Sequence, residues 1–168
     1  MPRLFVAVAL PPDVLEIIEG LDRPPVEGLR WTDREQWHVT LRFLGAVDDA
    51  DAVVAALRTV RALPRAAALG PAVARFAQRV LQIPVTGLDD VAAAVADATA
   101  ALGAPPEDRP FAGHLTLARV RGKRRLDVRP LTGAEVSASW PVEDVVLFES
   151  HLHPKGARYE VVERFPLA

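Results

Sequence analysis

Two short stretches of alternating polar and apolar residues stand out along the chain, at 38–41 and 114–117, and each has the sequence His-x-Thr-Leu. Both lie inside apolar runs that are typical of β-strands. Alternate side chains of a strand point to opposite faces, so His38 shares a face with Thr40. His114 and Thr116 share a face in the same way. The same pair of polar residue types therefore occupies one strand face twice.

The two stretches belong to a longer internal repeat. His38 and His114 are 76 positions apart, and the same shift carries the apolar run 4–6 onto 80–82. It also carries the helical pattern of 14–21 onto 90–97. The order strand, helix, loop and His-x-Thr strand is thus predicted twice. Two such units related by a pseudo-twofold axis would place the two His/Thr faces on opposite walls of one cleft.

The hydrophobic periodicity predicts more strands than helices. Strands are expected at 3–10, 37–44, 72–76, 79–85, 113–120, 134–140, 142–152 and 157–165. Helices are expected at 11–23, 49–62 and 89–102, a helical turn at 126–131, a loop at 26–36 and a weak linker at 65–71. Because several strands are joined by short turns, the pattern favours an α+β fold with antiparallel sheets and outer helices.

Composition narrows the possible partners. The 168 residues are half hydrophobic, which suits one compact domain or two small lobes. A net charge of −2 gives no basic footprint for wrapping duplex nucleic acid, so any such contact would be local: an end, a nucleotide or a short single strand. The chain has no cysteine, which excludes disulfides and thiolate metal sites. We find neither a membrane span nor a signal peptide and expect a cytoplasmic protein.

Paired histidines on facing walls suit acid–base catalysis. Histidine titrates near pH ~6.5, so one ring can accept a proton while the other donates one, which contributes on the order of 10²–10⁴ in rate. The threonine hydroxyls add donors for the oxygens of a phosphoryl group. This set fits phosphodiester cleavage without a metal, and a strained cyclic phosphate is the easiest such substrate. Two histidines without carboxylates or thiolates make a poor ligand set for zinc, so we expect neither metal nor cofactor.

Four residues near the two stretches are further candidates for the cleft. Arg42 lies four residues after His38, so strict alternation places both side chains on the same strand face. Arg42 could therefore line the cleft or its rim. Arg119 lies five residues after His114, so strict alternation places its side chain on the opposite strand face. A β-bulge would reverse this, so spacing alone does not determine whether Arg119 faces the cleft. Trp37 and Phe111 precede the two stretches and are expected at the cleft wall.

Two other polar groups are more simply explained as solvated. His151 and His153 share a strand face but lack a matching threonine. The basic turn 121–125 follows the second stretch, where it could also attract RNA phosphates.

The chain resembles the two-histidine (2H) phosphoesterases, and within them the RNA 2′,3′-cyclic phosphodiesterases historically called 2′-5′ RNA ligases. The similarity runs over nearly the whole chain and rests on both His-x-Thr motifs and their flanks. Those flanks are the segments 3–11, 38–45, 114–120, 148–150 and 156–160.

The resemblance implies a bilobal α+β fold over residues 1–168, with two antiparallel sheets facing a central cleft. We expect the lobes to meet near 65–71 and the C-terminal strands to return to the first lobe. It implies hydrolysis of a 2′,3′-cyclic phosphate to a 2′-phosphomonoester, with His38 as proton donor and His114 as proton acceptor. Thr40, Thr116 and Arg119 would bind the phosphate.

Three alternatives stay open. The chain could join RNA through a 2′-5′ bond, which needs the same residues with their roles exchanged. It could cleave a small cyclic nucleotide, or it could bind RNA ends without catalysis. The expected partners are RNA 2′,3′-cyclic phosphate ends, short RNA or nucleotides; we expect no membrane, no obligate protein partner and a monomer.

Overall fold

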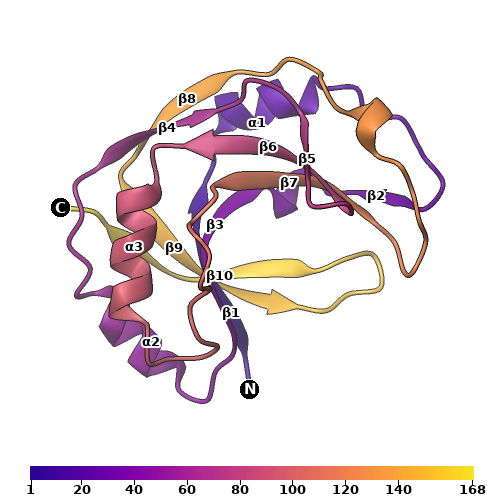
Figure 1. Ribbon diagram of the computed structural model, residues 1–168. Helices are drawn as coiled ribbons and strands as arrows, with labels where there is room; N and C mark the ends of the chain where they lie inside the picture. Colours follow the sequence, from indigo (N-terminus) through magenta and orange to yellow (C-terminus); the bar gives the residue numbers. More distant parts are fainter.

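The computed structural model describes all 168 residues and contains two antiparallel sheets and three α-helices (Figure 1). The first sheet has the order β10 (Arg158–Pro166), β9 (Asp144–His151), β1 (Arg3–Ala9) and β3 (His38–Ala46). The second has the order β2 (Leu29–Trp31), β7 (His114–Val120), β6 (Val80–Thr86), β4 (Arg65–Leu69) and β8 (Ala138–Val142), and β5 (Ala74–Phe76) pairs with β6. The predicted α+β class with antiparallel sheets is confirmed.

Each half of the chain places a helix on the sheet of the other half. The helix α1 (Pro12–Glu19) contacts β8 of the second sheet. The helix α3 (Asp89–Ala98) contacts β3 of the first sheet, and α2 (Ala50–Leu57) lies beside α3 (Figure 1). None of these helices is long and apolar enough to cross a membrane.

The helices begin where local chemistry favours a start. A proline occupies the first turn of α1, where its missing N–H costs no hydrogen bond. The side chain of Asp49 accepts a hydrogen bond from the backbone N–H of Ala52 at 3.1 Å and caps α2. Val14 and Ile18 of α1 are fully buried, whereas Ile17 is 43% exposed, so the apolar pattern of 14–21 faces the core only in part.

Two expectations for the connecting segments are wrong. The expected linker 65–71 contains β4, which pairs with both β6 and β8, so the chain passes between the sheets at residues 58–64. The expected loop 26–36 contains β2, which pairs with β7. The sequence pattern predicts neither strand, because β2 has only three residues and β4 is rich in alanine, which has a weak strand preference.

Both His-x-Thr strands carry a β-bulge at the same place. Along β3, Thr40 pairs with Ala7 and Arg42 pairs with Val6, which leaves Leu41 as the extra residue. Along β7, Thr116 pairs with Gln82 and Ala118 with Leu81, which leaves Leu117 as the extra residue. A bulge shifts the alternation of side chains by one position. The fourth residue after each histidine therefore faces the core, and the fifth faces the cleft.

This shift overturns the expectation that Arg42 lines the cleft or its rim. Its side chain is buried, with only 5% of the residue exposed. The guanidinium donates hydrogen bonds to carbonyl oxygens of Thr99, Leu102 and Ala104 at 3.2, 3.0 and 2.7 Å. These carbonyls follow the C-terminal end of α3, where a positive charge is favourable. Arg42 thus fastens α3 to the strand that carries His38.

Replacing Arg42 with methionine should destabilise the fold by about 3 kcal/mol, because several buried carbonyl oxygens lose their donor. Urea unfolding followed by tryptophan fluorescence measures the change. Arg125→Met is the matched control: this arginine is exposed and forms no hydrogen bond through its side chain, and its replacement should cost less than about 0.5 kcal/mol. Equal stability of the two variants would contradict the fastening role of Arg42.

Candidate active site

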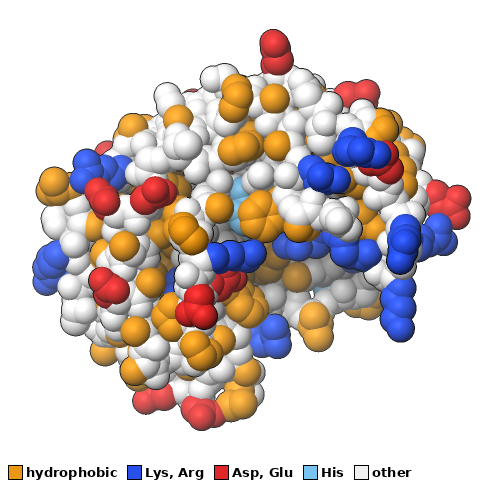
Figure 2. Space-filling model, in the orientation of Figure 1, with side chains coloured by type: hydrophobic (Ala, Val, Ile, Leu, Met, Phe, Trp, Pro, Cys, Tyr) orange, Lys and Arg blue, Asp and Glu red, His pale blue; other side chains and the backbone are white.

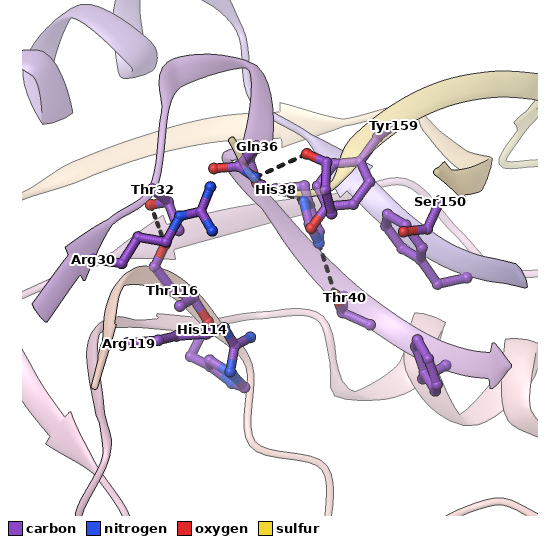
Figure 3. Close-up of a pocket in the computed structure, with 14 residues that line it drawn as sticks. Arg30, Thr32, Gln36, His38, Thr40, His114, Thr116, Arg119, Ser150 and Tyr159 are labelled. Carbon is purple, nitrogen blue, oxygen red and sulfur yellow. Dashed lines mark hydrogen bonds between the residues drawn. The ribbon is translucent and has the colours of Figure 1, made fainter. Parts of the chain in front are cut away.

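A cavity of about 320 Å³ lies between the two sheets, and 14 residues line it (Figure 3). They include both histidines and both threonines of the repeated motif, together with Arg119. The bulge in β7 brings Arg119 to the cavity, which settles its orientation. The other lining residues are Phe5, Arg30, Thr32, Gln36, Phe43, Ser150, Gly156, Ala157 and Tyr159.

Each histidine is oriented by the carbonyl oxygen of the residue two positions before it. Nδ1 of His38 lies 2.8 Å from the oxygen of Gln36, and Nδ1 of His114 lies 2.8 Å from the oxygen of Ala112. A carbonyl oxygen only accepts, so Nδ1 carries the hydrogen in both rings. Nε2 is therefore the atom that gains or loses a proton in each.

The two rings have different surroundings. His38 lies among aromatic rings: the centroid of Phe5 is 4.8 Å away and that of Tyr159 is 5.2 Å away, edge-on. Its Nε2 lies 2.9 Å from Oγ1 of Thr40. His114 stacks on Phe76, with 4.5 Å between the centroids.

Burial lowers the pKa of His38 from its usual value near 6.5 to about 4. The hydrogen bond to Gln36 opposes this shift, whereas the charge of Arg119 and the neighbouring imidazole of His114 add to it. His38 is therefore neutral at pH 7 in the free protein. Burial also raises the pKa of Tyr159, whose hydroxyl stays protonated and can donate a hydrogen bond.

Thr32 ties the two His-x-Thr motifs together. Its single hydroxyl hydrogen is shared between the carbonyl oxygens of Thr116 and Leu117, both at 2.9 Å, and its oxygen accepts from Nε1 of Trp37 at 3.0 Å. Figure 3 shows the hydrogen bond between Thr32 and Thr116. Trp37 directly precedes His38 in the chain. The indole of the residue before the first motif is thus linked through one hydroxyl to the backbone of the second motif.

The prediction that Trp37 and Phe111 line the cleft wall is wrong. Trp37 is buried and acts through Thr32, and Phe111 packs on the core; neither lines the cavity. The aromatic wall consists of Phe5, Phe43 and Tyr159 instead.

Two arginines face the cavity without an acidic partner. Arg30 lies directly opposite Arg119 in the pairing of β2 with β7. Neither guanidinium forms an ion pair with a carboxylate. Like charges opposite each other on neighbouring strands destabilise a sheet, and an anion between them would remove the conflict. The cavity is therefore suited to an anionic group such as a phosphate.

A glycine makes room for Arg30. Gly156 has φ +114°, which favours glycine, and a Cβ there would collide with the Arg30 guanidinium and lie 3.2 Å from the amide nitrogen of Gln36. That nitrogen donates to the oxygen of Ala157 at 2.9 Å, which holds the segment against the cavity. The similarity of segments 148–150 and 156–160 to the family could have indicated Ser150, Gly156 and Tyr159. No pattern in the sequence indicated Arg30.

The cavity is a poor site for a divalent metal because no carboxylate and no thiolate lines it. One cluster elsewhere has metal-ligand types. Nε2 of His151 lies 3.1 Å from a carboxylate oxygen of Glu160 and 3.9 Å from one of Glu149. The hydrogen bond between His151 and Glu160 accounts for this cluster, which lies outside the cavity.

Comparison with known proteins gives a consistent picture. A family model described as "LigT like Phosphoesterase" matches residues 6–79 and 81–159. The RNA 2′,3′-cyclic phosphodiesterase of Thermus thermophilus is 32% identical over 98% of this chain and 90% of that protein.

Solved structures are similar over the whole chain. The crystal structure of TT0787 of Thermus thermophilus has a TM-score of 0.81 at 28% identity, covering 98% of this chain and 97% of that chain. E. coli LigT complexed with 3′-AMP has a TM-score of 0.78 at 27% identity, covering 100% and 99%.

The imidazole of His38 should titrate with a midpoint near pH 4 in the free protein. Arg119→Gln removes a positive charge that disfavours the imidazolium and should move the midpoint upward. Proton–carbon NMR of the ring Cε1–H signals measures both values, with His38→Gln used to assign the peak. A wild-type midpoint at the ordinary value near 6.5 would contradict the desolvation of this ring.

Proposed function

Because the chain belongs to the LigT-like phosphoesterase family, we propose that it is an RNA 2′,3′-cyclic phosphodiesterase that yields a 2′-phosphomonoester. The observation that carries this proposal is that both histidine rings are oriented by the same kind of hydrogen bond. Each Nδ1–H is bound to a backbone carbonyl, which leaves Nε2 as the titrating atom of each ring in a single cavity. One ring can therefore give a proton while the other takes one.

The two proton transfers of the reaction are carried out by histidines on opposite walls of the cavity. His114 takes a proton from water through Nε2 as the water oxygen attacks phosphorus. The bond from phosphorus to the 3′ oxygen breaks, and His38 gives that oxygen the proton on its Nε2. The products are a 2′-phosphomonoester and a free 3′-hydroxyl, and exchange with solvent restores the two protonation states.

The phosphate would be held by donors from both walls. Thr40 and Thr116 contribute hydroxyls, and Arg119 contributes a guanidinium that can bind two phosphate oxygens at once. In the transition state these donors stabilise charge on the non-bridging oxygens. Arg30, Ser150 and Tyr159 line the same cavity and extend the set of donors.

Substrate binding also supplies the condition that His38 needs to act as an acid. In the free protein its pKa is about 4, in part because Arg119 is nearby. A bound phosphate anion offsets the charge of Arg119 and favours the imidazolium. Occupation of the phosphate site would thus favour the protonated form of His38, although burial, the main cause of its lowered pKa, remains.

The cellular setting stays a prediction. The substrate class and the absence of cysteine fit a cytoplasmic protein that acts as a monomer on RNA ends.

Replacing either histidine with alanine should lower kcat on a nucleoside 2′,3′-cyclic phosphate by on the order of 10²–10⁴. Turnover is measured in excess EDTA, and the position of the product phosphate is assigned by ³¹P NMR. His151→Ala is the matched control, because this histidine is exposed and lies outside the cavity; it should retain wild-type turnover. Loss of wild-type turnover in EDTA, or normal turnover of His38→Ala or His114→Ala, would refute the two-histidine mechanism.

Sulfate should raise the midpoint of the His38 titration, because it stays doubly negative over the whole pH range and can occupy the phosphate site. The same NMR signals measure the shift as sulfate is added. Arg119→Gln should respond much less, since its phosphate site lacks the guanidinium. If sulfate leaves the wild-type midpoint unchanged, phosphate binding does not charge His38, and its role as proton donor fails.

A further inference from the structure

Positive charge is concentrated around one side of the cavity. Two further hollows, of about 870 and 600 Å³, lie next to it. Together the three hollows are lined by ten of the 20 lysines and arginines but by only three of the 22 acidic residues. A protein with a net charge of −2 therefore carries one strongly basic region, and Figure 2 shows a row of lysine and arginine side chains along the edge of the central hollow.

The three hollows, which we call the basic track, follow one another through shared lining residues. Arg30 lines both the catalytic cavity and the second hollow. Arg124 lines both the second hollow and the third. A chain that leaves the cavity past Arg30 would therefore come close to Arg121, Arg124 and Lys155, which line the second hollow.

The turn 121–125 is fixed, so its cations have defined positions. Arg79 donates to the carbonyl oxygens of Val120, Gly122 and Arg124. The N–H of Arg121 donates to the oxygen of Gly28 at 2.8 Å. Arg79 thus serves the fold, and Arg124 is paired with Glu27 at 3.2 Å. The side chain of Arg121 has no such partner and is free to meet a ligand.

The turn 153–156 on the other side of the second hollow is fixed as well. The N–H of Lys155 donates to Nδ1 of His153 at 3.1 Å, and the N–H of Gly156 donates to the oxygen of His153 at 2.9 Å. The ammonium of Lys155 has no acidic partner. Arg121 and Lys155 are therefore two unpaired cations that line one hollow, each on a turn held by backbone hydrogen bonds.

We propose that this basic track binds the phosphates of the single-stranded RNA that leads to the cyclic end, so that oligonucleotides are preferred over mononucleotides as substrates. This inference rests on the proposed function and specifies its substrate class. Neutralising phosphates releases counterions, which makes such binding favourable and dependent on salt. Trp31 also lines the second hollow and adds an aromatic surface of the kind on which single-stranded bases stack.

The test compares two substrates with one variant. The substrates are cytidine 2′,3′-cyclic phosphate and a single-stranded RNA octamer that ends in the same group. In Arg121→Gln/Lys155→Gln, the ratio of kcat/KM for the octamer to that for the mononucleotide should fall about tenfold. Arg61→Gln/Arg65→Gln removes the same charge outside the three hollows and should leave this ratio within twofold of wild type.

Binding provides a readout that does not depend on turnover. Fluorescence anisotropy of the labelled octamer, measured from 50 to 300 mM salt, gives the slope of log Kd against log salt. Loss of two phosphate contacts should reduce that slope by about 1.4 in the Arg121→Gln/Lys155→Gln variant. An unchanged slope, an unchanged substrate ratio, or equally tight binding of a poly-glutamate peptide would contradict the proposal that the basic track binds RNA.

The two proposals fail in different ways. If the wild-type protein turns over neither substrate but the salt slope still depends on Arg121 and Lys155, the catalytic function is wrong and the RNA track stands. If cytidine 2′,3′-cyclic phosphate is hydrolysed and the variant matches the control in both measurements, the function stands and the track is wrong.

Discussion

One extra residue in each His-x-Thr strand determines which side chains reach the cleft. Leu41 and Leu117 are the extra residues, and each is followed by a second buried side chain. The two inward side chains in a row reverse the alternation, so that Phe43 and Arg119 line the cavity five residues after their histidines. The bulge recurs 76 positions later with the motif itself, which makes it part of the repeated unit.

The two walls differ in the side chain that follows each bulge. The inward residue after the bulge is Arg42 in β3 and Ala118 in β7. A buried guanidinium needs acceptors, and the carbonyl oxygens beyond α3 supply them. A methyl group needs none. The first wall therefore holds a helix end through hydrogen bonds, whereas the second wall packs at the same place through apolar contact alone.

The sequence indicated the chemistry better than it indicated the cavity. The paired motifs and the antiparallel sheets follow from local patterns of residue type. Arg30 does not, because it lies in a three-residue strand whose pairing with β7 joins positions almost 90 residues apart. The buried place of Trp37 could not be predicted either, because its indole donates to Thr32, which follows β2, a strand that the sequence pattern does not predict.

These long-range links have a consequence for catalysis. Each half of the chain covers the sheet of the other with a helix, and Thr32 connects the second motif to Trp37, the residue before the first motif. The walls that carry His38 and His114 are therefore held at a fixed separation. A site that transfers two protons and stabilises a phosphate depends on such placement, since a shift of about 1 Å can cost on the order of 100-fold in rate. The same links that made the cavity hard to predict from sequence are those that would allow two separate strands to act on one phosphate in the proposed reaction.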